Sequence, residues 1–256
     1  MAVVSKCVGG AFVLAAAGVW WCAASARQHD CPPSVFRDPA PGNTAALPVP
    51  RGPWSDGLAR NWFPQHQRHA KAAATGSISL LFLGDSITEG WGRPGQAVWQ
   101  RHFAVLDGAH FGIGGDQTQH LLWRIEHGEL DGLAPDSVVL LIGTNNLYTN
   151  TAAEIAEGIA VILREIRTRT PRSHVLLMGV LPRGRAPEAP ERAKICELNA
   201  LLSGYADCAI TYLDIGAQFL NPDGSLRIDL MPDGLHPSAA GYELWAQAVK
   251  SWFYAH

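Results

Sequence analysis

Four short polar segments of the sequence contain the residue types that nucleophilic catalysis needs. They are Gly-Asp-Ser at 84–86, Gly-Gly-Asp at 114–116, Thr-Asn-Asn at 144–146 and Asp-Gly-Leu-His-Pro at 233–237. A serine hydroxyl is a weak nucleophile until an imidazole accepts its proton, and a carboxylate fixes the tautomer of that imidazole. Asp233 and His236 stand close enough in sequence to pair within a turn. We therefore interpret Ser86 as the nucleophile, His236 as its base and Asp233 as the orienting carboxylate.

The same segments contain hydrogen-bond donors for an oxyanion. Acyl transfer passes through a tetrahedral intermediate whose negative oxygen needs such donors, and loss of one donor costs about 3 kcal/mol. The backbone N–H groups of Ser86 and Gly115 and the side-chain amide of Asn145 are suited to this role. Gly115 is preferred over Gly114 because it directly precedes the acidic residue of its segment.

Each segment also has a simpler interpretation when it is taken singly. A lone serine can cap a helix, paired glycines can form a tight turn, and asparagine or aspartate can bond the nearby backbone. A dinucleotide site is not indicated, because Gln117 occupies the last glycine position of a Gly-x-Gly-x-x-Gly pattern counted from Gly112. The combination of a nucleophile, a base, a carboxylate and oxyanion donors favours catalysis.

Alternating apolar runs and helical patterns predict how these segments are positioned. Buried strands are expected at residues 78–83, 109–113, 137–142, 174–181 and 210–213, and helices at 62–73, 152–169, 191–205 and 239–253. Strands that alternate with helices of this length indicate βαβ crossovers and a parallel sheet between helical layers. Ligands bind at the carboxyl ends of such strands, so the polar segments should meet at one edge.

Composition and charge restrict the partners of the chain. The chain of 256 residues is 47% hydrophobic and 17% charged, which is enough apolar material for a packed core. Its formal net charge is −3, and it has no long Lys/Arg block. We therefore do not expect the chain to bind nucleic acid, and we expect its substrate to be a small molecule.

The N-terminal part of the chain differs from the rest. Lys6 is followed by a charge-free stretch through Ala26 that ends in small residues, which predicts an export signal over residues 1–26. Cleavage would give a secreted or extracytoplasmic protein, and a retained segment would anchor it to a membrane. Residues 27–61 are predicted to form a Pro-rich extended segment, with seven prolines between Gln28 and Asp56, and residues 62–256 to form the domain that contains the four polar segments.

Three cysteines remain if the export signal is removed. Cys31, Cys196 and Cys208 permit one disulfide and one spare thiol. The favoured pair is Cys196 with Cys208, and three unpaired cysteines are the alternative. The Cys/His spacing of a zinc site is not found in the sequence.

The four segments resemble, in order, blocks I, II, III and V of the SGNH (GDSL-type) hydrolase family. The matching sequences are Leu-Gly-Asp-Ser-Ile-Thr at 83–88, Gly-Ile-Gly-Gly-Asp at 112–116, Gly-Thr-Asn-Asn at 143–146 and Asp-x-x-His at 233–236. The stretch from 62 to 253 is most similar to platelet-activating factor acetylhydrolase catalytic subunits and related bacterial acylhydrolases. Further runs at 111–116, 120–124, 128–130 and 181–184 also resemble that subgroup.

The resemblance implies a fold and an activity. The fold is a flavodoxin-like three-layer α/β/α sandwich with a parallel sheet of about five strands. The activity is hydrolysis of short-chain, acetyl esters through a Ser-His-Asp acyl-enzyme, which requires no metal or organic cofactor. A homodimer is a further expectation. Ile87 and Leu235 flank the nucleophile and the base, so we expect them to narrow the acyl pocket.

The substrate stays open between an acetylated lipid and an acetylated glycan. The main alternative is therefore an extracytoplasmic carbohydrate O-acetylesterase. A non-catalytic binding protein on the same fold is a second alternative, and the complete set of catalytic residue types argues against it. A phosphate or flavin binder on this sheet would not need the pairing of Asp233 with His236.

Overall fold

The computed structural model describes residues 36–52 and 61–255. The predicted export segment 1–26 and Cys31 therefore lie outside the described residues. No helix within the described ranges combines the length and the apolar character needed to cross a membrane.

A parallel sheet of five strands forms the centre of the domain. Its order is β2-β1-β3-β4-β5, with bounds β1 Leu80–Gly84, β2 Gly108–Gly112, β3 Ser137–Leu141, β4 His174–Met178 and β5 Ile210–Leu213. In register, Gly84 pairs with Gly112 on one side and with Leu141 on the other. These three strands therefore end at the same level, and the segments that follow them meet at one edge, as the sequence predicted.

Three strands are shorter than predicted, and one of them, β3, differs by a single residue because it ends at Leu141 where residue 142 was expected. The first starts at Leu80, where residue 78 was expected, and the fourth ends at Met178, where residue 181 was expected. Beyond β4, the side chain of Asn199 takes both backbone groups of Val180, accepting from its N–H at 2.8 Å and donating to its C=O at 3.0 Å. A buried side chain thus replaces the sheet ladder at a position where apolar character alone predicted a longer strand.

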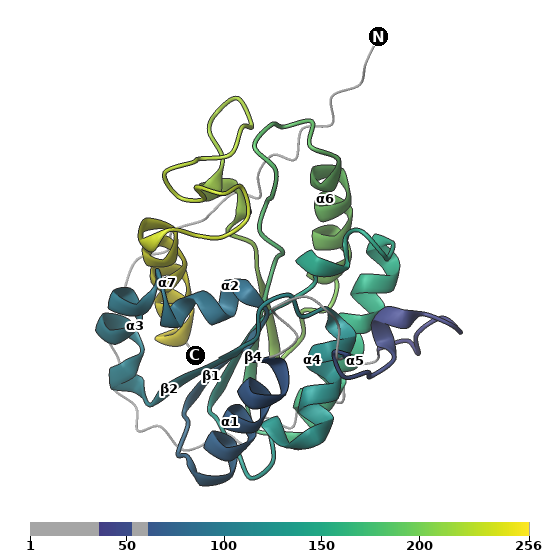
Figure 1. Cartoon of the computed structure of the whole chain (residues 1–256), viewed down its shortest axis with the longest axis vertical. Helices are drawn as coiled ribbons and strands as arrows, with labels where there is room; N and C mark the ends of the chain where they lie inside the picture. The colour runs from purple at the N-terminus through teal and green to yellow at the C-terminus, as the bar shows by residue number, and fades with distance from the viewer. Residues whose placement is uncertain (1–35, 53–60, 256) are drawn as a thin grey trace.

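Helices cover both faces of the sheet and give three layers (Figure 1). One face carries α1 Trp62–Thr75, α4 Thr118–Arg124, α5 Ala152–Arg169 and α6 Pro190–Ser203. The other carries α2 Ser86–Glu89, α3 Gln96–His102 and α7 Ala239–Phe253. The predicted α/β/α sandwich is confirmed. Alternate residues of β1 point into different layers, Leu81 and Leu83 into the first and Leu80 and Phe82 into the second.

Helix α5 shows how local sequence sets an element. Thr151 and Glu154 form a capping box, with the Thr151 hydroxyl accepting from the Glu154 N–H at 3.2 Å. Its isoleucines recur at spacings of three and four, so they share one face and are all buried. The helix begins and ends at the predicted residues.

Residues 36–52, here called the N-terminal strap, lie against α4 and α5. A single 3-10 turn, η1 Thr44–Ala46, is the regular structure of this segment, and Ala45 and Ala46 are buried. The Thr118 hydroxyl donates to the Ala45 carbonyl at 2.7 Å, and the Asn43 side chain donates to the Glu154 carbonyl at 2.9 Å. These contacts hold the strap on the helical layer beside the sheet edge.

The favoured disulfide pairing was wrong. Cys208 forms a disulfide, and Cys196 keeps an exposed thiol on α6, so the two are not bonded to each other. The partner of Cys208 lies outside the described residues. A disulfide requires two side chains that approach each other at suitable geometry, and spacing along the chain does not reveal that geometry.

Candidate active site

Ser86 stands at the junction of β1 and α2. Asp85 caps this helix, its carboxylate accepting from the Ile87 N–H at 2.9 Å, so the serine is not the cap that its simpler interpretation proposed. The Ser86 Oγ lies 2.9 Å from the Nε2 of His236. Because a buried strand fixes the first turn of α2, the hydroxyl is held at the carboxyl edge of the sheet.

His236 and Asp233 lie on the loop between β5 and α7. The His236 Nδ1 is 2.6 Å from Asp233 Oδ2, while Asp233 Oδ1 accepts from the backbone N–H groups of Leu235 and His236 at 2.9 and 2.7 Å. Burial disfavours the charged carboxylate, but the hydrogen bonds from His236 and Leu235 outweigh it and lower the pKa of Asp233. An ionised Asp233 favours the tautomer that leaves Nε2 able to accept the serine proton.

The predicted oxyanion donors lie beside Ser86. Gly115 has a φ of +77°, which glycine adopts without the strain of other residues. Asn145 belongs to η6 Thr144–Asn146, and its amide nitrogen donates to the Asp116 carbonyl at 2.8 Å. Ser86, Gly115, Asn145 and His236 line one pocket of about 470 Å³. Residues from three strand ends and one distant loop therefore share a single cavity.

The two predicted acyl-pocket residues take different positions. Leu235 lines the pocket. Ile87 does not line it: this residue is 2% exposed in the core, and its carbonyl accepts from the hydroxyl of Tyr242 at 2.6 Å. Ile113, which directly precedes the two glycines, stands on the pocket wall together with Leu235.

Several pocket residues were not singled out from the sequence. They are Asn61, Gln65, Glu89, Gly90, Arg93, Pro94 and Tyr242. Arg93 and Glu89 form an ion pair at 2.8 Å along one helical turn. Glu89 stands three residues after Ser86, a spacing that places both on one side of a helix and could have identified it. Asn61 and Gln65 had no such signal, because only the packing of α1 brings them to the pocket.

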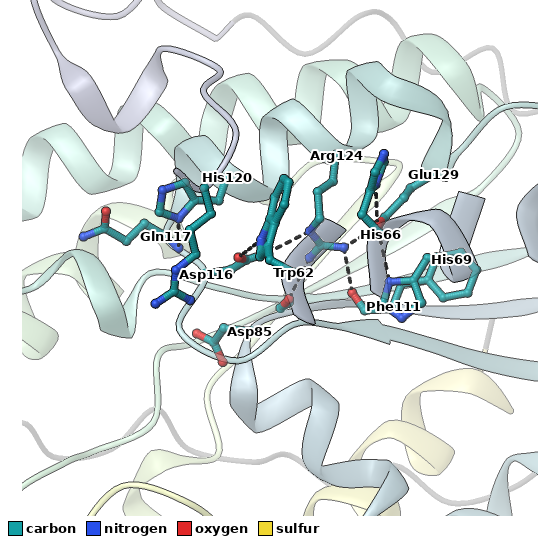
Figure 2. Close-up of polar contacts among 12 residues, drawn as sticks. Trp62, His66, His69, Asp85, Phe111, Asp116, Gln117, His120, Arg124 and Glu129 are labelled. Atoms are coloured by element: carbon teal, nitrogen blue, oxygen red, sulfur yellow. Dashed lines mark hydrogen bonds and ion pairs between the residues drawn. The ribbon is translucent and has the colours of Figure 1, made fainter. Parts of the chain in front are cut away.

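A buried arginine ties together the backbone behind the pocket. Arg124 donates to the Gly84 carbonyl at 3.0 Å and to the Phe111 carbonyl at 3.1 Å, which are near the ends of β1 and β2. It also donates to Asp116 Oδ2 at 2.8 Å and forms an ion pair with Glu129. Figure 2 shows the guanidinium between these two carboxylates. The ends of two strands and the adjacent residues Gly114 and Gly115, here called the glycine loop, are therefore joined through one side chain.

Further side chains form hydrogen bonds with the two carboxylates that Arg124 contacts, those of Asp116 and Glu129. The Trp62 indole N–H donates to Asp116 Oδ1 at 2.7 Å, and the Nδ1 atoms of His66 and His69 lie 3.1 and 3.3 Å from Glu129 Oε1 (Figure 2). Burial disfavours the charged form of Glu129, but Arg124 and the two histidines outweigh it and lower its pKa. A buried ion pair of this kind is stable because its remaining hydrogen-bonding positions are filled.

Burial raises the pKa of Asp116 to about 6, in contrast to Glu129, and Asp85 shows the same effect more strongly. Asp85 is fully buried next to Ser86, and that burial raises its pKa to about 7 despite the hydrogen bond from the Ile87 N–H. Its Oδ2 lies 3.5 Å from the amide nitrogen of Asn145. Asp85 thus titrates near neutral pH, between the nucleophile and a predicted oxyanion donor.

The arrangement of these side chains suits acyl transfer. As a separate finding, the described ranges contain no group of three or more His, Cys, Asp or Glu side chains that could hold a metal ion. A hydroxyl, an imidazole and a carboxylate are connected in series, and Gly115 and Asn145, the predicted donors, line the same cavity as Ser86 and His236. Such a set can generate a serine nucleophile and stabilise the negative oxygen that its attack creates.

The sequence and the fold are similar to those of known proteins. Residues 82–244 match the model of the GDSL-like Lipase/Acylhydrolase family. The platelet-activating factor acetylhydrolase IB subunit alpha2 of Rattus norvegicus is 37% identical over 183 residues, covering 71% of this chain and 78% of that protein. Subunit alpha1 of the same species is 35% identical over 214 residues, covering 82% and 88%. A GDSL-like lipase from Bacteroides thetaiotaomicron shares the fold, with a TM-score of 0.60 and 24% identity over 74% of this chain and 97% of that one.

Proposed function

Because this chain belongs to the GDSL-like lipase/acylhydrolase family and is a carboxylic ester hydrolase, we propose that it cleaves short-chain, acetyl esters through a Ser86 acyl-enzyme. The observation that carries this proposal is the connected series Ser86–His236–Asp233. Its two hydrogen bonds, of 2.9 and 2.6 Å, begin in the pocket and end at a carboxylate.

The proposed reaction has two halves. Ser86 Oγ attacks the ester carbonyl while His236 Nε2 takes its proton, and Asp233 stabilises the imidazolium through Nδ1. Backbone N–H groups of Ser86 and Gly115 and the Asn145 amide donate to the oxyanion. His236 then protonates the departing alcohol, leaving an acyl group on Ser86. A water molecule, deprotonated by His236, attacks this acyl-enzyme. The bond between Ser86 Oγ and the acyl carbon then breaks, His236 returns the proton to Ser86 Oγ, and the acid leaves.

A small acyl group is favoured by the apolar side of the pocket. Ile113 and Leu235 line the pocket together with Ser86, and both have branched apolar side chains. The matched relatives in Rattus norvegicus carry the name acetylhydrolase, which is consistent with this preference. We therefore expect turnover to fall as the acyl chain lengthens.

A carbohydrate O-acetylesterase is the second candidate, because several residues that line the pocket are polar. Asn61, Gln65 and the Glu89–Arg93 pair present amide, carboxylate and guanidinium groups there. Such planar groups hydrogen-bond well to the several hydroxyls of a sugar. The same groups could also accept a glycerophospholipid head, so the leaving group is decided by assay.

We infer that the protein acts outside the cytoplasm. The charge-free segment after Lys6 has the composition of an export signal. The disulfide of Cys208 supports this location, because structural disulfides persist in oxidising compartments. Fractionation of cells that express the full chain tests the inference, and recovery of all the protein from the cytosol would contradict it.

Hydrolysis of p-nitrophenyl acetate, butyrate and octanoate by the full chain, beside its Ser86→Ala variant, tests the proposed mechanism. The expected result is the highest kcat/KM on acetate and loss of activity in the variant. Activity that survives in Ser86→Ala would refute Ser86 as the nucleophile. Acetylated xylo-oligosaccharide and an acetylated glycerophospholipid, compared at equal concentration, then distinguish the two leaving groups.

A further inference from the structure

Arg51, on the N-terminal strap, contacts the peptide group that joins Gly114 to Gly115. Its Nη1 donates to the Gly114 carbonyl at 2.6 Å. This carbonyl belongs to the same peptide group as the Gly115 N–H, one of the proposed oxyanion donors. We propose that Arg51 is a positioning residue, which orients and polarises this peptide so that the Gly115 N–H stabilises the oxyanion. The inference rests on the proposed function.

The strap is fixed well enough to deliver Arg51 to this point. Before Arg51, the Val49 N–H donates to the Gln119 carbonyl at 3.3 Å, and Ala45 is buried against the helices. A Cβ at Gly158 of α5 would lie 2.5 Å from the Ala45 carbonyl oxygen, so glycine permits this close approach. The N-terminal strap is thus held against the helices as far as Val49, which is two residues before Arg51.

The guanidinium also packs closely against Gly115. A Cβ built there would lie 2.4 Å from Arg51 Nη1 and 2.9 Å from Nη2. Because Gly115 also has a positive φ, both backbone conformation and the arginine require glycine at this position. The guanidinium therefore contacts both Gly114 and Gly115, where it restrains the rotation that two adjacent glycines would otherwise allow.

Two physical effects make this contact relevant to catalysis. A hydrogen bond from a charged donor is roughly twice as strong as a neutral one, so it resists a flip of the peptide plane. A donor on the carbonyl also polarises the amide and strengthens the N–H on its other side, by about 10–30% per bond. Both effects act before the substrate arrives, which is the form of oxyanion stabilisation that accelerates a reaction.

Arg51 acts through Gly115 and does not touch the reacting atoms. It is not among the described residues that line the pocket. Its removal should therefore lower kcat and leave KM nearly unchanged. A merely structural role, that of fastening the strap, would instead lower thermal stability and leave kcat of the folded enzyme intact.

The test compares Arg51→Met and Arg51→Lys in the full chain, with p-nitrophenyl acetate as substrate. Complete loss of an oxyanion donor costs on the order of 100-fold or more in kcat, so a loosened donor in Arg51→Met should cost about tenfold. Arg51→Lys keeps a charged donor and should recover part of the loss. Arg164→Met is the matched control, because it removes the exposed strap contact of Arg164 with Asp38 at 3.2 Å and does not reach the glycine loop. Its kcat should equal that of the unmodified chain.

A second measurement does not depend on turnover. The amide ¹⁵N resonance of Gly115, observed with ¹⁵N-glycine labelling, responds to hydrogen bonding at the preceding carbonyl. It should move in Arg51→Met and stay in place in Arg164→Met. An unmoved resonance would overturn the proposal even if kcat fell, and an unchanged kcat in an active, Ser86-dependent enzyme would overturn it even if the resonance moved. Absence of Ser86-dependent hydrolysis in the unmodified chain would instead refute the proposed function, and the resonance would then test the effect of Arg51 on this peptide.

Discussion

Arg124 donates a hydrogen bond of 3.0 Å to the carbonyl of Gly84, although 40 residues separate them in sequence. Gly84 is the last residue of β1 and stands two positions before Ser86. The same guanidinium binds Asp116, which directly follows the glycine loop. A single buried cation thus holds both the strand end before the nucleophile and the residue after the glycine loop. We therefore expect its removal to lower the stability of the fold.

Replacement of Arg124 by Met should destabilise the protein by about 3–5 kcal/mol, because Asp116 and Glu129 would remain buried without their cation. Urea denaturation followed by circular dichroism measures the change. Arg227→Met is the control, since it breaks an exposed ion pair with Asp229 and should cost at most about 1 kcal/mol. Equal effects of the two substitutions would refute the special role of Arg124.

Replacement of Asp233 by Asn should lower kcat on p-nitrophenyl acetate by about 10³- to 10⁴-fold. Asparagine keeps an oxygen for the backbone N–H groups of Leu235 and His236, but its amide cannot accept from His236 Nδ1 and favours the wrong tautomer. The melting temperature should change little, because Asp233 is largely exposed. Near-normal turnover by this variant would show that His236 does not depend on Asp233.

Replacement of Gly115 by Ala should lower kcat about 100-fold. The new Cβ would meet Arg51 and displace the peptide that carries the proposed oxyanion donor. Gly132→Ala separates this effect from backbone strain, because Gly132 has a similar φ of +80° but no atom within 4 Å of a Cβ. Gly132→Ala should cost about 1 kcal/mol of stability and no activity. A comparable loss of kcat in both variants would contradict the assignment.

Replacement of Asp85 by Asn should weaken the pH dependence of stability. The folded protein binds the Asp85 proton more tightly than the unfolded chain, since burial raises its pKa from 3.8 to about 7. The free energy of unfolding therefore falls as pH rises through this window, by on the order of a few kcal/mol, and Asn removes that fall. Urea denaturation at about pH 5 and about pH 8 measures it. Asp136→Asn, at an exposed position, is the control, and its pH profile should match the unmodified chain.

Replacement of Leu235 by Ala should raise turnover of p-nitrophenyl octanoate relative to acetate. Leu235 lines the pocket beside His236, so truncation of its side chain opens space for a longer acyl group. Leu201→Ala, on the exposed side of α6, should leave the ratio unchanged. The idea that Leu235 narrows the acyl site fails if octanoate gains nothing.

Elements with strong local signals could be predicted from the sequence. The bounds of α5, α7 and β5 agree with the structure because periodicity and caps are properties of neighbouring residues. The motif spacing likewise identified Ser86 and His236, which the fold brings within 2.9 Å. Because parallel strands end at a common edge of the sheet, the position of each polar segment directly after a strand was enough to predict that these segments lie close together.

Contacts between distant residues were decided by the tertiary structure. The partners of Arg124 and Arg51, the polar pocket wall at Asn61 and the disulfide of Cys208 depend on how side chains of separate elements face each other. Periodicity shows which face of an element is buried, but not which atom that face meets. The sequence by itself therefore determined the fold and the chemical groups of the site, while only packing decided which buried charges and backbone contacts hold those groups in place.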